Sequence, residues 1–351
     1  MKSNKRNIIL SMVSILLIIL FAYLVNKYHL LDNYVIRILN NCAIYTILGL
    51  SMNLINGFTG MFSLGHAGFM AVGAYITALL TMKIESKEKI FYMDPLIFPF
   101  NKIVMPFIFA LIIAGLVTAL FAFLIGAPVL RLKGDYLAIA TLGFAEIIRV
   151  VVTNTLNLTN GALGIKEIPP SANLVWTFCI AIFTTVFLVL LIKSSYGKAL
   201  KAIREDEIAA EAMGINLFKH KLIAFMIGAF FAGIGGGLLA SILGTIDPTM
   251  FKFTLTFNIL LIIVLGGMGS ITGTIISAFL VTIGQEWLRF LDSRMNLGFM
   301  VIERPGLRMV VFSLILVIVV IFFRRGIMGS NEFSWDYLFN KINKKPLKKG
   351  E

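Results

Sequence analysis

The sequence has 351 residues, of which 58% are hydrophobic and only 14% are charged, and its net charge at pH 7 is +13. Soluble domains carry about 25% charged residues, so this composition excludes an ordinary soluble protein. Apolar runs of about 20 residues recur along the chain, and an α-helix needs this length to cross a bilayer. The short alternating segments of a membrane β-barrel are absent. The composition therefore predicts an all-α, polytopic transmembrane helical bundle.

The positive charge has two interpretations. A basic soluble protein would be a candidate for nucleic-acid binding. In a membrane protein, Lys and Arg gather in the cytoplasmic segments and fix the orientation of the chain. We favour the second interpretation and expect no nucleic-acid partner. The two cysteines, Cys42 and Cys179, both lie in apolar runs, so we expect neither a disulfide nor a metal site.

In chain order, ten apolar segments predict membrane-spanning helices over residues 8–25, 37–55, 61–82, 103–125, 135–154, 173–192, 221–243, 253–268, 271–290 and 307–323. The first resembles a signal peptide, but no small-residue cleavage site follows it, so we expect a retained span. Lys and Arg are more frequent in the segments that this arrangement places inside. An even number of spans then puts both termini in the cytoplasm.

Two glycine-rich breaks, at residues 56–63 and 266–273, resemble each other, and each leads into a helix rich in small residues. Interrupted segments at corresponding places in the two halves of a transporter indicate an internal repeat around the transport path. The alternative is that these glycines simply end helices at the membrane interface.

Polar side chains inside the predicted spans are the candidates for a solute path. Glu146 and Arg149 lie three residues apart on one helical face, where they can form either a path-lining element or a structural ion pair. His66 has no carboxylate near it in the sequence, which favours a neutral, hydrogen-bonded side chain over a proton relay. The predicted path-lining residues are Asn53, Asn56, Ser63, His66, Thr141, Glu146 and Arg149.

The chain carries no phosphate-binding loop of the form GxxxxGK[ST], no HExxH and no nucleophile elbow. We therefore do not expect an enzyme. If ATP drives this protein, another chain must bind the nucleotide.

Residues 194–220 lie between two apolar runs, yet they are strongly charged and rich in helix-forming residues. Each charge would cost about 2.5 kcal/mol or more inside hydrocarbon, so this segment is an aqueous loop with helical structure. A short helix there ends at Gly214, which can adopt a positive φ. Its apolar side chains can fill a groove on a partner protein while the charges select that partner. The alternative is a solvated helix that lies on the membrane surface.

Four segments in this order resemble the LivM-type permeases of bacterial branched-chain amino-acid ABC transporters: residues 53–69, 134–144, 196–216 and 264–274. The loop departs from the general importer pattern Glu-Ala-Ala-x-x-x-Gly in one respect. Ala209, Ala210 and Gly214 match, whereas the glutamates stand at 207 and 211. On this resemblance, the residues that couple the chain to an ATPase are Ala199, Ile203, Glu207, Ala209, Ala210, Glu211 and Gly214.

The resemblance implies a multi-pass subunit of the bacterial inner membrane that imports leucine, isoleucine or valine. Its partners would be a second homologous permease, two cytoplasmic ATPases that hold ATP and Mg²⁺, and an extracytoplasmic solute-binding protein. Residues 1–325 would form the permease domain, with the coupling loop at 193–220, and residues 326–351 a basic cytoplasmic tail. A permease for urea or short amides is the nearest alternative. A stand-alone secondary transporter is a more distant one, because it needs more intramembrane carboxylates than Glu146 supplies.

Overall fold

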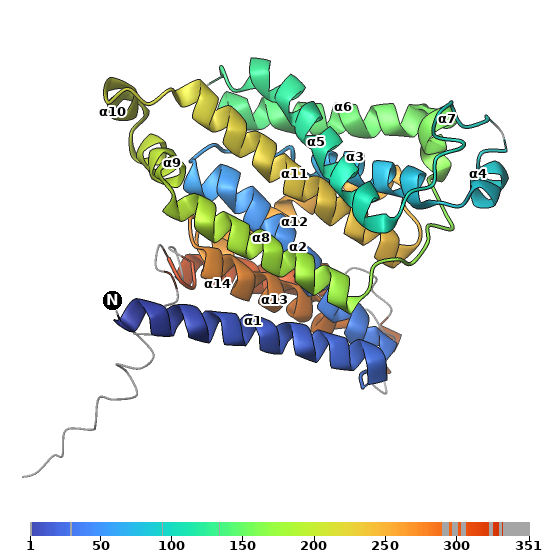
Figure 1. The fold of residues 1–351 in the computed structure, drawn as a ribbon, viewed down its shortest axis with the longest axis horizontal. Coiled ribbons are helices and arrows are strands. Elements are labelled where there is room, and N and C mark those ends of the chain that lie inside the picture. The colour runs from blue at the N-terminus through green and yellow to red at the C-terminus, as the bar shows by residue number, and fades with distance from the viewer. Residues whose placement is uncertain are drawn as a thin grey trace, which may run out of the picture.

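The computed structural model describes residues 2–28, 30–92, 94–132, 134–289, 295–296, 301–302, 307–322, 326–329 and 332. These residues form a bundle of α-helices (Figure 1). The helices are α1 (Lys2–Tyr28), α2 (Asn33–Asn53), α3 (His66–Thr81), α4 (Ile84–Ile90), α5 (Phe107–Val129), α6 (Asp135–Asn154), α7 (Leu156–Thr159), α8 (Leu174–Lys193), α9 (Ser195–Glu205), α10 (Glu207–Ala212), α11 (Leu217–Leu243), α12 (Phe253–Gly266), α13 (Ile271–Trp287) and α14 (Leu307–Phe322). Shorter elements are the π-helix η1 (Leu54–Phe58), the 3₁₀ turns η2 (Gly161–Leu163) and η3 (Pro248–Phe251), and the strand pair β1 (Met295–Asn296) and β2 (Val301–Ile302).

Each of the ten predicted segments contains a helix. Five helices within the described residues are long and apolar enough to cross a membrane: α2 with η1, α5, α6, α8 and α11. The pair α3 and α4, bent by 120° between its two helices, would be a sixth. The helices α12, α13 and α14 are shorter, with 14, 17 and 16 residues. The structure is thus that of a polytopic helical membrane protein.

The centre of the bundle is formed by α2 and α11, which are mostly buried, with α3 and α5 against α11. Glycines allow α3 and α11 to touch, because a Cβ atom at Gly73 would lie 2.1 Å from the carbonyl oxygen of Gly233. The outer helices α5 and α8 expose large apolar side chains such as Leu116 and Leu190. Such faces suit contact with lipid.

The helix predicted over 61–82 begins five residues later than expected, because a non-helical stretch precedes it. The helix α2 runs on as η1 to Phe58, the chain from 59 to 65 is not helical, and α3 begins at His66. Gly60 has a φ of +74°, a conformation that favours glycine and ends the helical path. Most side chains of this non-helical stretch are buried, so the break lies inside the bundle.

The two ends of the bundle differ. The helices α9 and α10 lie at the same end of the bundle as the start of α1, and α4 and α7 lie at the opposite end (Figure 1). Residues predicted as part of the tail pack back at the first end: Ile327 N–H donates to the carbonyl of Leu265 at 2.8 Å. Residues 330–331 and 333–351 of the predicted tail lie outside the described residues.

Candidate functional site

The two glycine-rich breaks are in contact with each other through Asn53. The Asn53 side-chain nitrogen donates to the carbonyl of Ser270 at 2.9 Å and to the Thr274 hydroxyl at 2.8 Å. Its oxygen accepts from the backbone N–H of Gly269 at 2.9 Å. Asn53 is fully buried. A residue predicted to line the path therefore joins the break after α2 to the turn between α12 and α13.

Other predicted residues supply hydrogen bonds to the non-helical chain between η1 and α3. The Asn56 side chain donates to the Ser63 carbonyl and accepts from the Ser63 N–H, at 3.2 and 3.3 Å. The Thr141 hydroxyl accepts from the N–H of Leu64 at 2.9 Å. Non-helical backbone at membrane depth is tolerated where its polar groups are satisfied by protein. These buried side chains therefore stabilise the break.

His66 begins α3 and is buried, with its Nε2 atom 2.9 Å from the Ser51 hydroxyl on α2. The contact ties the first residue of α3 to the helix that precedes the break. The N–H of the next residue, Ala67, donates to the Thr256 hydroxyl on α12 at 3.0 Å. Helices α2, α3 and α12 are thus connected around the start of α3.

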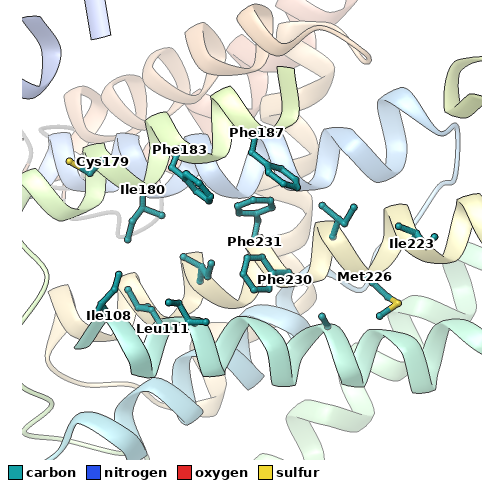
Figure 2. A pocket seen from close by; sticks show the side chains of 14 residues that line it. Ile108, Leu111, Cys179, Ile180, Phe183, Phe187, Ile223, Met226, Phe230 and Phe231 are labelled. Atoms are coloured by element: carbon teal, nitrogen blue, oxygen red, sulfur yellow. The ribbon is translucent and has the colours of Figure 1, made fainter. Parts of the chain in front are cut away.

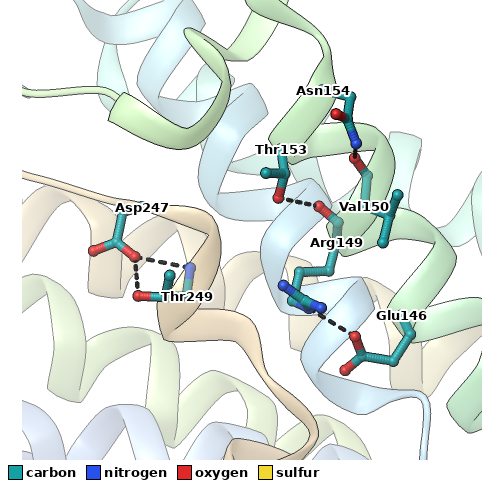
Figure 3. Close-up of polar contacts among 7 residues, drawn as sticks. All are labelled: Glu146, Arg149, Val150, Thr153, Asn154, Asp247 and Thr249. Atoms are coloured by element: carbon teal, nitrogen blue, oxygen red, sulfur yellow. Dashed lines mark hydrogen bonds and ion pairs between the residues drawn. The ribbon is translucent and has the colours of Figure 1, made fainter.

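Glu146 and Arg149 form an ion pair on α6, with Arg149 Nε 2.7 Å from Glu146 Oε2 (Figure 3). Both side chains are about 30% exposed, with values of 30% for Glu146 and 27% for Arg149. Thr153 and Asn154, one turn further along, donate to backbone carbonyls of their own helix. Neither side chain of the pair forms a hydrogen bond with Asn53 or Asn56 within the described residues.

The loop between α8 and α11 is anchored to both breaks by Arg204 on α9. Arg204 Nη1 donates to the carbonyl of Gly57 in η1 at 2.9 Å, and Nη2 lies 3.2 Å from Glu205. A Cβ atom at Gly269 would lie 2.5 Å from Arg204 Nη1, so the guanidinium touches the second break as well. On the same helix, the Lys201 ammonium lies 5.9 Å from the ring centre of Phe58.

The helix α10 is closed at both ends by local hydrogen bonds. The Asp206 carboxylate accepts from the N–H groups of Ile208 and Ala209, at 2.8 and 3.0 Å, and so caps the first turn. At the other end Gly214 has a φ of +83°, as predicted, and the N–H of Ile215 donates to the carbonyl of Ala210. This short helix has a defined shape although most of it is exposed.

The predicted coupling residues divide into two groups. Ile203 and Ala210 are buried within this chain, so they position the loop and are not free to contact a partner. Ala199 is half-buried. The exposed members are Glu207, Ala209, Glu211 and Gly214.

Two apolar residues of this surface were missed from the sequence. Ile208 is 82% exposed and Met213 is 83% exposed, beside the exposed glutamates of α10. Their position in an exposed, charged loop was the available signal.

The loop is also fixed to α11. Lys221 Nζ lies 2.6 Å from Glu207, and the Tyr196 hydroxyl donates to the carbonyl of His220 at 2.6 Å. The rings of Tyr196 and His220 are stacked, and burial raises the pKa of Tyr196 to about 12. These contacts link α9 and α10 to the central helix of the bundle.

A cavity of about 780 Å³ between α5, α8 and α11 is almost entirely apolar (Figure 2). Phe183 and Phe187 on α8 face Phe231 on α11 there, with ring centres 6.5 and 5.4 Å apart. This lining offers no partner for the charged groups of a zwitterion, so the cavity suits a lipid acyl chain better than an amino acid.

A family model described as branched-chain amino acid transport system / permease component matches residues 34–320. The chain is 36% identical over 280 residues to the high-affinity branched-chain amino acid transport system permease protein LivM of Escherichia coli K12 and of Salmonella typhimurium LT2. These matches cover 70% of this chain and 61% of each relative, so the chain spans less than two thirds of their length. It is 25% identical over 284 residues to the probable branched-chain amino acid transport permease protein LivH of Methanocaldococcus jannaschii, a match that covers 75% of this chain and 82% of the relative. No solved structure matches.

Proposed function

Since this chain belongs to the family of permease components of branched-chain amino acid transport systems, we propose that it is the permease subunit of an ATP-driven importer of leucine, isoleucine and valine. The observation that carries the proposal is the coupling of the exposed helix α10 to the two helix breaks. Arg204 contacts the carbonyl of Gly57 and the backbone of Gly269, and α10 follows α9 directly. A partner that moves α10 therefore moves the broken helices.

The proposed partner at α10 is a cytoplasmic ATPase, one of two, which holds the ATP and Mg²⁺. Ile208 and Met213 would enter a groove on the ATPase, and Glu207 and Glu211 would select it by charge. Ile203 and Ala210 would hold the loop in shape from inside. ATP binding would draw the loop helices of two permeases together and rock the spans between outward and inward access.

A second, homologous permease completes the proposed membrane unit, and a solute-binding protein delivers the amino acid from outside. The chain's own similarity to LivH-named as well as LivM-named permeases supports a pair of related subunits. A permease that relies on a separate binding protein needs little selectivity of its own, which agrees with few intramembrane charges.

The proposed topology has ten spans in the bacterial inner membrane, with both termini in the cytoplasm. The four short helices α3, α12, α13 and α14 would cross with the help of the non-helical stretches beside them. The breaks at 59–65 and 267–270 would be equivalent positions of an internal repeat. The permease domain would extend over residues 1–325 with its coupling loop at 193–220, and the tail would start near 326.

The experiment that tests this function is purification of the tagged chain from its native membrane, with identification of the proteins that accompany it. We expect two ATPases and a second permease. A matched variant, Ile208→Asp with Met213→Asp, should lose the ATPases and keep the second permease, while Lys198→Ala on the same loop should keep both. A chain that purifies alone and moves solute without ATP would refute the proposal.

A further inference from the structure

We propose that a polar groove between α2, α12, α13 and α14 is this chain's wall of the solute path, and that it binds a branched-chain amino acid on its way through the membrane. The groove encloses about 610 Å³, and its lining mixes amide, hydroxyl and carboxylate groups with aromatic and aliphatic ones. This inference rests on the proposed function. None of the predicted path-lining residues belongs to this groove.

The helix contacts fix the depth of each lining residue. The antiparallel helices α12 and α13 touch at Gly266 and Gly273, because a Cβ atom at Gly273 would lie 2.1 Å from the carbonyl oxygen of Gly266. At the other end of α13, the Arg289 guanidinium lies 5.9 Å from the ring centre of Tyr34 on α2. Counting along the helices from these contacts places the lining residues in three layers.

The layers differ in chemistry. The outer layer is nearest to Arg289 and farthest from the loop helices α9 and α10, the middle layer is about one turn deeper, and the inner layer is about one further turn down. In this order they hold Thr254 and Gln285, then Asn41, Asn258 and Thr282 beside Phe257, then Tyr45 and Leu261. The inner pair packs on the apolar cluster that includes Ala278. The amide and hydroxyl groups thus lie in the outer and middle layers, with the ring of Phe257 among them, and the inner layer is mainly aromatic and aliphatic.

The middle layer contains polar atoms that this chain does not satisfy. Thr282 is 8% exposed, and its hydroxyl forms no hydrogen bond to oxygen or nitrogen within the described residues. The side-chain oxygen of Asn41 is likewise buried and unpaired there. The thiol of Cys42, a weak hydrogen-bonding group, is the neighbour of the Thr282 hydroxyl. The Asn41 oxygen and the Thr282 hydroxyl therefore keep hydrogen-bonding capacity on the wall of the groove, where a ligand or water can use it.

The surroundings of the groove cannot be hydrocarbon alone. Polar side chains at membrane depth face the protein interior or water, because exposure to lipid is costly. The apolar cavity between α5, α8 and α11 has the lining of a lipid-facing site, and the groove does not. The face with the groove is therefore the face that the second permease covers.

The layers match the two parts of the solute. Amide and hydroxyl groups of Asn41, Asn258 and Thr282 can bind the ammonium and carboxylate of an amino acid without a strong charge that would trap it. Tyr45 and Leu261 offer an apolar surface for its branched side chain. At the outer end, Glu286 lies 2.8 Å from Arg289, so both signs of charge stand where a zwitterion arrives.

The first test is cysteine labelling in the assembled transporter, with Cys42→Ala and Cys179→Ala as background. A negatively charged, membrane-impermeant methanethiosulfonate, applied from outside, should label Asn258→Cys. Leucine, isoleucine or valine should slow this labelling. Leu280→Cys is the matched control, because Leu280 is 52% exposed at a similar depth on α13 but does not line the groove. It should not react.

Labelling that no branched-chain amino acid slows, in a transporter that takes up leucine, would overturn the proposed site. Equal labelling of the two cysteines, or of neither, would overturn the groove as a path. If the assembled transporter takes up no leucine, the proposed function has failed. The labelling contrast between Asn258→Cys and Leu280→Cys then still decides whether the groove is a water-filled path.

The second test compares two hydroxyl deletions on α13. Thr282→Val removes the groove hydroxyl whose described neighbour is only the weakly hydrogen-bonding thiol of Cys42, and Ser277→Ala removes a buried, unpaired hydroxyl that does not line the groove. Thr282→Val should lower the rate of leucine uptake at saturating solute-binding protein about fivefold, the effect of one lost hydrogen bond, with unchanged amounts of assembled transporter. Ser277→Ala should leave this rate unchanged. Equal effects of the two substitutions would mean that Thr282 acts through helix packing alone.

Discussion

At the scale of single residues, Arg204 connects parts of the chain that are far apart in sequence. Its guanidinium donates to Gly57, 147 residues away, and touches Gly269 in the other break. Gly57 has no room for a side chain, since a Cβ atom there would lie 2.5 Å from the backbone nitrogen of Gly269, and Gly269 has a φ of +89°, which favours glycine. We therefore expect Arg204 to position both breaks.

Replacement of Arg204 by Ala should lower leucine uptake at least tenfold, while the ATPases still co-purify. A hydrogen bond from a charged donor contributes about 1.5–3 kcal/mol, and 1.4 kcal/mol corresponds to a factor of ten. Arg204→Lys should retain part of the activity because it keeps the charge. Lys198→Ala, an exposed position on the same helix, is the control and should transport normally. Normal uptake by Arg204→Ala would contradict the coupling role.

The ion pair between Glu146 and Arg149 predicts non-additive stability. Glu146→Gln leaves an unpaired cation on α6 and should lower the melting temperature of the purified protein. The double variant Glu146→Gln with Arg149→Gln should melt at a higher temperature than this single variant, because removal of both charges leaves none uncompensated. If the two single effects simply add, the residues do not stabilise each other in the folded chain.

Lys87 predicts that the stability of the fold depends on pH at the end of the bundle opposite α9 and α10. It lies on α4, is 2% exposed, and donates to the carbonyls of Phe100 and Ile103 at 2.8 and 2.6 Å. Burial lowers its pKa from the ordinary value of 10.5 to about 8. Because the folded pKa lies below the unfolded one, the charged form destabilises the fold below about pH 8. This cost is relieved as the pH rises from about 8 to 10.5.

Limited proteolysis of the 83–102 segment measures this effect. Protection of the wild-type chain relative to Lys87→Met should increase between pH 7 and pH 9, since the variant has no amine to titrate. The ratio removes the pH dependence of the protease itself. A ratio that stays constant over this range would contradict the buried charge.

At the scale of elements, the close contact of α3 and α11 depends on glycine. Gly73→Ala would place a methyl group 2.1 Å from the carbonyl oxygen of Gly233. The clash is with the backbone of a packed helix, so α3 and α11 would have to separate to relieve it. We expect a loss of stability of about 1–3 kcal/mol or more, measured as a lower melting temperature and yield. Gly143→Ala on α6 is the control, because its Cβ meets no atom within 4 Å. It should be neutral or stabilising by up to about 1 kcal/mol. If Gly143→Ala lowered the melting temperature more than Gly73→Ala, the helices would be arranged differently from this structure.

The sequence predicted the helices well where the apolar pattern starts and stops sharply. Predicted range 135–154 coincides with α6, and 173–192 differs from α8 by one residue at each end. The helix prediction failed at 61–65, because Met61, Phe62 and Leu64 continue the apolar pattern through a stretch that is not helical. An apolar pattern predicts that residues are buried, but it does not show that they are helical. The buried backbone N–H groups of this stretch form hydrogen bonds with side chains of η1 and α6 instead of with a helix of their own.

The site was less accessible from the sequence than the fold. Asn53, Asn56 and Thr141 could be singled out as polar residues in apolar runs, but their hydrogen bonds connect segments as much as 221 residues apart. The polar groove joins residues of four helices, each of which contributes only a few polar groups. No local pattern marks such a surface, because it exists only after the helices have packed.

At the scale of the whole molecule, we propose that one end of the bundle couples to the ATPase and the other end admits the solute. One end carries the exposed helix α10, the guanidinium of Arg204 and both breaks, and the groove opens near the opposite end at Arg289. Motion of α10 would reach the groove through η1 and α2 on one side, and through the 267–270 turn and α13 on the other. Glu332 supports the second route, because its carboxylate accepts from the N–H groups of Ile271 and Thr272 at 2.6 and 3.0 Å.

The most direct test of the central claim is transport by the purified complex in sealed vesicles, with the solute-binding protein outside and ATP inside. We predict accumulation of radiolabelled leucine that requires ATP and the binding protein, is inhibited by isoleucine and valine, and is absent for urea. Uptake of leucine without ATP, or ATP-driven uptake of urea in place of leucine, would contradict the account.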